Sequence, residues 1–128
     1  MSIPNIDELL ILNKEVAVDG LGGVDLYENM IDSFEEMSLR KTLIILKIAV
    51  DEFDYYSVYT QAHILKGSAS YLRADRVSLL AEKIQADVEQ QLPDEAFKDY
   101  ALLLKQCILL KRAVRFDILK RKGRNSLI

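Results

Sequence analysis

The stretch YYSVYTQAHILKGSASYL, residues 55–72, decides the fold. Its apolar residues recur at steps of four, three, four and three positions: Val58, Ala62, Leu65, Ala69 and Leu72. An α-helix turns by about 100° per residue, so this spacing gathers the apolar side chains on one face. The stretch therefore predicts a helix over about 55–72 whose apolar stripe faces a core.

Helical spacing continues outward from this stretch in both directions, and no alternating strand pattern competes with it. Asp25 with Glu28 resembles a capping box, and Asp75 and Asp94 are plausible caps of later helices. A helix is expected over about 5–18, ending before 19–23. Residues 26–53 would form one helix, or two nearly continuous ones with a kink at 37–39. The last two helices would cover about 75–91 and 94 to about 122, with Gly123 as the terminator of the second.

Four substantial helices with short connections predict an all-α fold, an antiparallel up-and-down four-helix bundle with an additional short N-terminal helix. The 128 residues are about the length of one domain. We therefore expect a single domain over 1–128. Its bundle core would cover about 21–121, the N-terminal helix within 1–20 would pack on the bundle, and 123–128 would form a tail.

Charge is unevenly distributed along the chain. Residues 1–60 hold twelve acids and four bases, whereas residues 105–124 hold eight bases and one acid. A basic end can mark a nucleic-acid or membrane tail. Bases in the last turns of a helix also complement its dipole, and the many apolar residues of this segment favour that second interpretation. We therefore expect no nucleic-acid partner and no membrane partner.

The compartment is predicted from what the sequence lacks. No apolar run reaches the roughly 18 residues of a membrane span, and the first ten residues are acidic where a signal peptide is basic. The single Cys107 excludes an intrachain disulfide and a cysteine-based zinc site. These features predict a cytoplasmic protein, and its small size would also permit nuclear entry.

His63, the only histidine, lies roughly 140° from the centre of the apolar stripe and so should face solvent. Gly67 follows one turn later, although a mid-helix glycine costs about 1 kcal/mol relative to alanine. Its missing side chain would leave room for another molecule to approach the imidazole. Lys66 would place an ammonium group near whatever binds there.

Two apolar side chains, Ile64 and Tyr71, also point away from the stripe. Exposed apolar groups around a polar centre suggest a docking surface. Leu79, about 200° from the stripe of its own helix, would extend this rim or meet the N-terminal helix.

These residues resemble the histidine-containing phosphotransfer (HPt) domains of two-component phosphorelays. The family pattern is Ala-His-x-Leu-Lys-Gly-Ser-Ser/Ala followed by an apolar residue, Gly-Ala and a leucine-rich continuation. The sequence AHILKGSA, residues 62–69, matches it in order, as do Leu72 and Ala74. VSLLAEKIQ in the next helix and GGVDLYENMIDSF upstream are similar to the flanking family segments. The resemblance spans about 21–121.

The resemblance implies a stand-alone phosphorelay intermediate without its own ATP site. His63 would accept a phosphoryl group through Nε2 from the receiver domain of a hybrid histidine kinase and pass it to the receiver of a response regulator. Lys66 would counter the phosphate charge, and Gly67 would give the receiver room. Ser68 and Gln85 would support the site. We expect a monomer.

The chemistry suits these residues. Imidazole is a competent nucleophile at physiological pH because its unperturbed pKa is about 6.5. Phosphoryl transfer needs mainly alignment and charge neutralisation. No carboxylate occurs between Asp54 and Asp75, so we predict no metal site and no cofactor, with Mg²⁺ supplied by the receiver domain.

One residue departs from the family pattern. Arg73 stands where a glycine usually ends the histidine helix in a left-handed turn. Because arginine is strained in that conformation, we expect the helix to end differently or to run on to Ala74.

Other interpretations start from the same residues. An autokinase usually has an acid directly after the histidine, where this chain has Ile64, and the chain has no phosphate-binding glycine-rich loop. A metal or haem bundle would supply inward-facing ligands from several helices. A non-catalytic bundle that binds receivers or other signalling domains as an adaptor is the main alternative.

Overall fold

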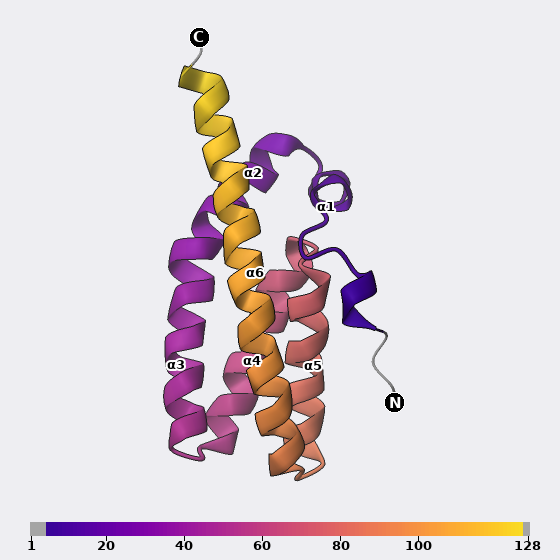
Figure 1. The fold of residues 1–128 in the computed structure, drawn as a ribbon, viewed down its shortest axis with the longest axis vertical. Helices are drawn as coiled ribbons and strands as arrows, with labels where there is room; N and C mark the ends of the chain where they lie inside the picture. Colours follow the sequence, from indigo (N-terminus) through magenta and orange to yellow (C-terminus); the bar gives the residue numbers. More distant parts are fainter. Residues whose placement is uncertain (1–4, 127–128) are drawn as a thin grey trace.

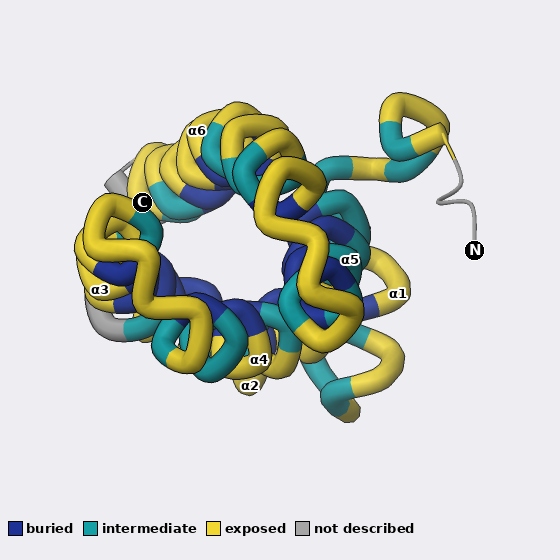
Figure 2. Tube along the Cα trace, turned by 90° about the horizontal axis from the view of Figure 1, so that it is seen from below, coloured by how far each residue is buried: buried dark blue, intermediate teal, exposed yellow. Residues whose placement is uncertain are grey.

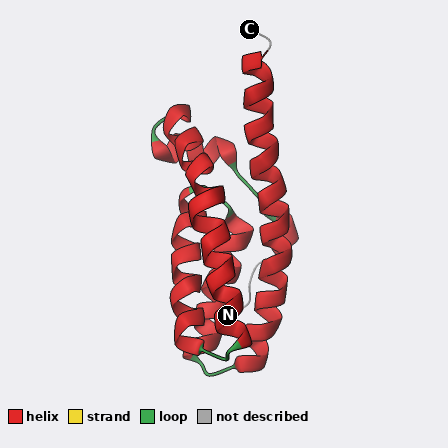
Figure 3. Cartoon of the chain, turned by 90° about the vertical axis from the view of Figure 1, so that its left-hand side faces the viewer, coloured by secondary structure: helices red, strands yellow, loops and turns green. Residues whose placement is uncertain are grey.

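The computed structural model describes residues 5–126, which are helical almost throughout (Figures 1 and 3). None of these described residues lies in a β-strand. The elements in chain order are a short 3₁₀ turn (Ile6–Glu8), α1 (Lys14–Leu21), α2 (Val24–Ser33), a π-helical segment (Phe34–Leu39), α3 (Arg40–Asp51), α4 (Tyr55–Tyr71), α5 (Asp75–Glu89) and α6 (Pro93–Ser126).

The core lies between α3, α4, α5 and α6. Seen end-on, these helices surround a common centre with their buried residues turned toward it (Figure 2). The predicted stripe of α4 is at most 4% exposed at each of its five positions. Cys107 on α6 is also buried, and desolvation raises the pKa of its thiol to about 12. The apolar periodicity therefore correctly predicted an all-helical fold and the buried face of α4.

Three short turns join α3 to α4, α4 to α5 and α5 to α6, and all three have the same form. Each places a non-glycine residue in the left-handed region: Phe53 (φ 55°), Arg73 (φ 56°) and Gln91 (φ 57°). In each, the next N–H donates to the carbonyl five residues earlier, at 2.9 Å. This is the hydrogen bond of a Schellman motif, which satisfies a carbonyl left free at the helix end.

The expectation that arginine would change the end of the histidine helix is wrong. α4 ends at Tyr71, and Arg73 takes the left-handed conformation that glycine usually supplies. Its guanidinium binds both carboxylate oxygens of Asp75, at 3.0 and 3.1 Å. Its carbonyl accepts the N–H of Asn13 at 3.0 Å. The local pair with Asp75 and the tertiary bond from Asn13 both stabilise this turn.

The continuous N-terminal helix predicted over 5–18 is also wrong. Asn5 caps the 3₁₀ turn and Asn13 caps α1, with an extended segment between them. The extended chain reaches α5, where the Arg76 guanidinium donates to the Leu9 carbonyl at 2.8 Å. α1 ends at Leu21, and the residue that caps it, Gly22, has a φ of 86° that suits glycine.

The beginning of α2 also differs from its prediction. The residue before its first turn is Gly23, and no side chain caps the helix there. Asp25 is therefore already inside the first turn, and the predicted capping box with Glu28 does not form.

The prediction for 26–53 is confirmed: α2 and α3 are nearly continuous, and the interruption is the π-helical segment over 34–39. A π segment is an identifiable cause of a helix irregularity. α5 begins at Asp75, as the sequence predicted, but the aspartate is its first helical residue and not its cap. α6 begins one residue before the predicted cap, at Pro93.

α6 continues through Gly123 to Ser126, so the predicted end at 122 and the tail from 123 are wrong as far as the structure is described. Residues 1–4 and 127–128 lie outside the described part. Glycine permits a helix to continue at a cost of about 1 kcal/mol relative to alanine, so one glycine need not end it.

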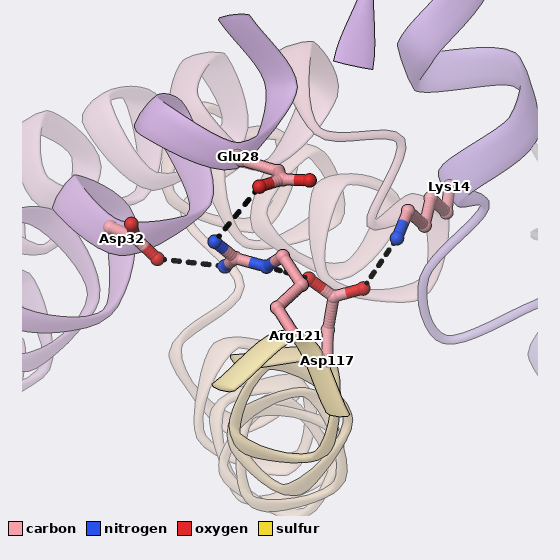
Figure 4. A network of polar contacts seen from close by, with 5 residues as sticks. All are labelled: Lys14, Glu28, Asp32, Asp117 and Arg121. Carbon is pink, nitrogen blue, oxygen red and sulfur yellow. Dashed lines mark hydrogen bonds and ion pairs between the residues drawn. The ribbon is translucent and has the colours of Figure 1, made fainter. Parts of the chain in front are cut away.

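The acidic first half and the basic end of the chain meet in a network (Figure 4), at the end of the molecule where α1 and α2 lie beside the C-terminal part of α6 (Figure 1). Arg121 on α6 binds Glu28 at 3.2 Å and Asp32 at 2.8 Å, both on α2. It also binds Asp117 at 3.2 Å, and Asp117 in turn binds Lys14 on α1 at 2.8 Å. At this end, bases of α6 therefore pair with carboxylates of the same chain.

Among the described helices, none has the length and apolarity needed to cross a bilayer.

Candidate functional site

His63 lies on the outer face of α4, between buried Ala62 and exposed Ile64. The imidazole is exposed, as the helical wheel predicted. Its Nδ1 atom is 3.2 Å from Nε2 of Gln85 on α5. Elsewhere in the described part of the chain, no group forms a hydrogen bond with the other ring nitrogen. The histidine is therefore held through one nitrogen and presents the other to solvent.

This contact belongs to a row of polar pairs along the seam between α4 and α5. The residue numbers in each pair have the same sum, as expected for facing positions of two antiparallel helices. The pairs, in order along α4, are Tyr59–Glu89 (2.9 Å), His63–Gln85 (3.2 Å), Lys66–Glu82 (3.5 Å), Ser70–Ser78 (2.7 Å) and Arg73–Asp75 (3.0 Å). The seam thus pairs polar side chains on the side of α4 that faces α5 and orients the imidazole.

Lys66 lies one turn after His63 and is half-buried. Its Nζ atom is 3.5 Å from Oε1 of Glu82, a carboxylate that is itself half-exposed. A long ion pair between partly exposed groups contributes little stability. A dianionic phosphoryl group bound near His63 could therefore compete with Glu82 for the ammonium.

Gly67 is exposed, and a side chain added there would have no heavy atom within 4 Å of its Cβ. It lies at the edge of an open groove of about 520 Å³ between α4 and the segment formed by α2 and the π helix. The groove is lined by Asn29, Met30, Ser33, Phe34, Ser38, Gly67, Ser68, Tyr71 and Leu72. Packing within α4 therefore does not require the glycine, and its place beside the groove suits the close approach of another molecule.

The remaining predicted residues differ in their surroundings. Ile64 and Tyr71 are 47% and 66% exposed, so both are available to a partner. Leu79 is half-buried and offers less surface than either. Ser68 donates its hydroxyl to the Ile64 carbonyl at 3.0 Å, so that hydroxyl bonds the helix backbone and is not directed at the imidazole.

Sequence reasoning missed three residues of the seam. Tyr59 donates to Glu89 and, together with Gln85, borders the histidine on the side of the α4 N-terminus. Glu82 holds Lys66. Glu82 and Glu89 lie beyond the range of local motif spacing, but the antiparallel register about the turn at 73 would have placed them opposite α4.

The arrangement can present one nucleophilic nitrogen to a partner, with a cation one turn away and space beside it. Within residues 5–126, apart from the side chains that are not described, no three histidine, cysteine or carboxylate side chains gather as a metal site.

Comparison of the chain with protein-family models, with curated proteins and with solved structures finds no match.

Proposed function

We propose that this protein is a histidine phosphocarrier of a multistep phosphorelay. The observation that carries the proposal is the exposed His63, held at Nδ1 by Gln85, with Lys66 and Gly67 one turn further along the same helix. A buried structural histidine would not have this exposure. The match of residues 62–69 to the family pattern supports the same interpretation.

In the proposed reaction, the Nε2 lone pair attacks the phosphorus atom of an aspartyl phosphate on a receiver domain. The N–P bond forms as the P–O bond to the aspartate breaks, and the electron pair of that bond leaves with the carboxylate. Transfer to a second receiver reverses these steps at another aspartate. Alignment of the two proteins supplies most of the catalysis.

Gln85 would set the tautomer that this attack requires. A glutamine amide can turn either its oxygen or its NH₂ group toward a ring nitrogen. With Oε1 toward the ring, Nδ1 keeps its proton and donates it to the amide, so Nε2 carries the free lone pair. After transfer the imidazole ring is cationic, and the same Nδ1–H donor then forms a stronger, charge-assisted bond.

Lys66 would leave Glu82 and neutralise part of the phosphoryl charge. Ile64, Tyr71 and the groove beside Gly67 would form the receiver's docking surface, and Ser68 would support it by shaping the groove wall. Mg²⁺ would come from the receiver, and the protein would need no ATP site or cofactor of its own.

The larger-scale expectations belong to the same proposal. The helices α3 to α6 would form the antiparallel up-and-down four-helix frame typical of phosphotransfer domains. The protein would act as a cytoplasmic monomer, small enough to enter a nucleus, and its partners would be receiver domains of a hybrid kinase and of response regulators.

An adaptor that binds receivers without transfer is the second candidate. The exposed apolar rim and the groove favour it, because both serve binding and neither requires a nucleophile. It differs from the phosphocarrier in one observable, the covalent phosphohistidine.

The deciding experiment incubates the protein with each phosphorylated receiver domain from the same source. We expect label on the protein that is labile in acid and stable in base, as an N–P bond is. His63→Gln should still bind the receiver and should carry no label. If binding persists with every receiver while no label appears on the native chain, the phosphocarrier is wrong and the adaptor stands.

A further inference from the structure

α6 has two apolar faces, and the bundle uses only one of them. The inner face buries Leu103, Cys107, Leu110 and Val114, each at most 2% exposed. Along the outer face, four apolar side chains lie in solvent: Leu102 (37% exposed), Leu109 (40%), Phe116 (69%) and Leu119 (64%). Ile108, which is 55% exposed, lies next to this row. Core packing within this chain does not account for that second face.

The outer face has the period of a helix–helix seam. Its residues Leu102, Lys105, Leu109, Arg112, Phe116 and Leu119 follow one another at alternating steps of three and four. A mean step of 3.5 residues is the spacing with which one helix presents knobs to another in a coiled coil. The face therefore fits a second helix lying along about 26 Å of α6.

The charge of this face is entirely basic. Lys105 and Arg112 are exposed, and within the described chain neither has an ion pair or a side-chain hydrogen bond. The single acid between 105 and 124 is Asp117, which is buried on the inner side and held by Lys14 and Arg121.

We propose that this outer face binds an acidic amphipathic helix of a partner protein. Docking an apolar helix there would desolvate two unpaired cations, at several kcal/mol for each fully buried ion. A carboxylate facing each cation removes that penalty. Lys105 and Arg112 are seven residues apart, or about 10.5 Å along the axis, so the matching carboxylates would be one heptad apart on the partner.

The chain already contains a small example of this recognition. Glu28 and Asp32, one turn apart on α2, present two carboxylates to Arg121 on the inner side of α6 (Figure 4). The proposed partner would likewise pair helix carboxylates with bases of α6, but on the outer side, one heptad apart and with apolar residues between its acids.

Two other occupants fit less well. In a parallel pairing with a second copy, Lys105 and Arg112 would each face their own counterpart, and an antiparallel pairing would supply no carboxylate. In helices that bind lipid surfaces, bases flank a wide apolar face. Here they alternate with the apolar residues inside a narrow stripe.

This interface does not depend on the proposed phosphoryl transfer. In the end-on view α6 lies across the bundle from α4 (Figure 2), so a partner on its outer face would leave His63 accessible. An acidic partner could therefore hold the protein while a receiver domain docks at α4.

The test uses a designed 21-residue amphipathic peptide with Leu at each a position and Glu at each d position, and a matched peptide with Lys in place of Glu. Fluorescence anisotropy measures the binding of each to the full chain. We expect the acidic peptide to bind at least tenfold more tightly than the basic one, with an affinity that falls as salt rises. The double substitution Lys105→Glu and Arg112→Glu should reverse that preference.

The control is Arg40→Glu with Lys41→Glu, which changes two exposed bases of α3 by the same charge and should leave peptide binding unchanged. Circular dichroism verifies that both variants fold. Equal affinity for the two peptides, or no binding of the acidic one, would overturn the proposal. Two further results would also overturn it. If the native chain binds phosphatidylcholine–phosphatidylserine vesicles and the Lys105/Arg112 variant does not, the face binds lipid. If the native chain self-associates in sedimentation and the variant does not, the face binds a second copy.

Discussion

At the scale of single residues, the site depends on which atom of each side chain is engaged. His63 is bonded at Nδ1, Lys66 is shared with Glu82, and Ser68 is bonded to its own helix. Only the first of these arrangements orients a nucleophile. Gln85 is therefore the neighbour of His63 whose removal should affect chemistry and not only binding.

Gln85→Ala should slow phosphoryl transfer to His63 about fivefold, because one neutral hydrogen bond is worth about 1 kcal/mol. Rapid-quench labelling from a phosphorylated receiver measures the rate, and ¹⁵N shifts of the imidazole report its tautomer. Ser78→Ala, which removes a different pair of the same seam, is the control. An unchanged tautomer together with an unchanged rate would exclude a positioning role for Gln85.

Gly67 separates stability from docking. Gly67→Ala should stabilise the fold by up to about 1 kcal/mol, since alanine favours a helix and no atom obstructs its Cβ. Gly67→Gln should fold normally and still slow transfer, because its side chain would occupy the space beside the imidazole. Gly20→Ala in α1 is the control for the helix effect. A large fall in melting temperature for Gly67→Gln would show that this position packs against the protein.

At the scale of elements, the three turns between α3 and α6 show how non-glycine residues can end helices. Each left-handed residue lacks the freedom of glycine, yet each turn closes the same hydrogen bond. The strain is compatible with the fold because the following helix packs back on the preceding one. Replacing any of these three residues by glycine should therefore preserve the fold. The change in stability should depend on the contacts of the side chain that is removed.

Gln91→Gly should stabilise the protein by roughly 0.5 kcal/mol. It relieves about 1–2 kcal/mol of left-handed backbone strain and loses about 0.5–1 kcal/mol to the greater freedom of the unfolded chain. Arg73→Gly should gain less, because it also loses the bonds to Asp75. Urea unfolding of both variants measures the difference. Greater stabilisation by Arg73→Gly would mean that its ion pair contributes nothing.

At the scale of the whole molecule, α1 and α2 meet the far end of α6 through buried apolar residues and through an ion-pair network centred on one cation. Arg121 is 14% exposed and contacts three carboxylates. Buried Tyr27 lies under Lys14, whose Nζ atom is 5.5 Å from the ring centre. Burial, and then the charge of Asp117, raise the pKa of the Tyr27 hydroxyl, which favours its neutral form.

Arg121→Met should destabilise the protein by roughly 3 kcal/mol, because the buried carboxylate of Asp117 loses one of its two cations. Hydrogen exchange should show the loss of protection concentrated in α1, α2 and the end of α6. Lys120→Met, an exposed neighbour, should change stability by much less. Equal effects of the two substitutions would contradict the role given to the network.

Asp87 should make stability depend on pH. It is 2% exposed, and its burial and the nearby Asp99 raise its pKa to about 6, although Lys83 lies 2.7 Å away. The folded state then binds the proton more tightly than the unfolded state, whose aspartate titrates near 3.8. Protonation of Asp87 therefore stabilises the folded state. This contribution to the free energy of unfolding is complete below about pH 4 and is lost as pH rises through about 6.

Urea unfolding between pH 4 and pH 7 tests this sign. As pH rises, the unfolding free energy of the native protein should fall relative to that of Asp87→Asn. A constant difference over that range would show that Asp87 titrates alike in the folded and unfolded chains.

The sequence by itself determined that the fold is all-helical and which face of α4 is buried, because apolar period and helix geometry are local properties. It also predicted the exposed face that carries His63, Ile64, Gly67 and Tyr71. Those features can be predicted without knowing how the helices pack against one another.

Tertiary structure alone decided what depends on distant partners. Arg73 takes its left-handed turn with support from Asn13, the N-terminal segment breaks to reach Arg76, and Glu82 meets Lys66 through the register of two helices. In each case residues far apart in the chain exchange hydrogen bonds that local spacing cannot anticipate. Backbone strain and helix breaks are compatible with the fold only because those bonds form.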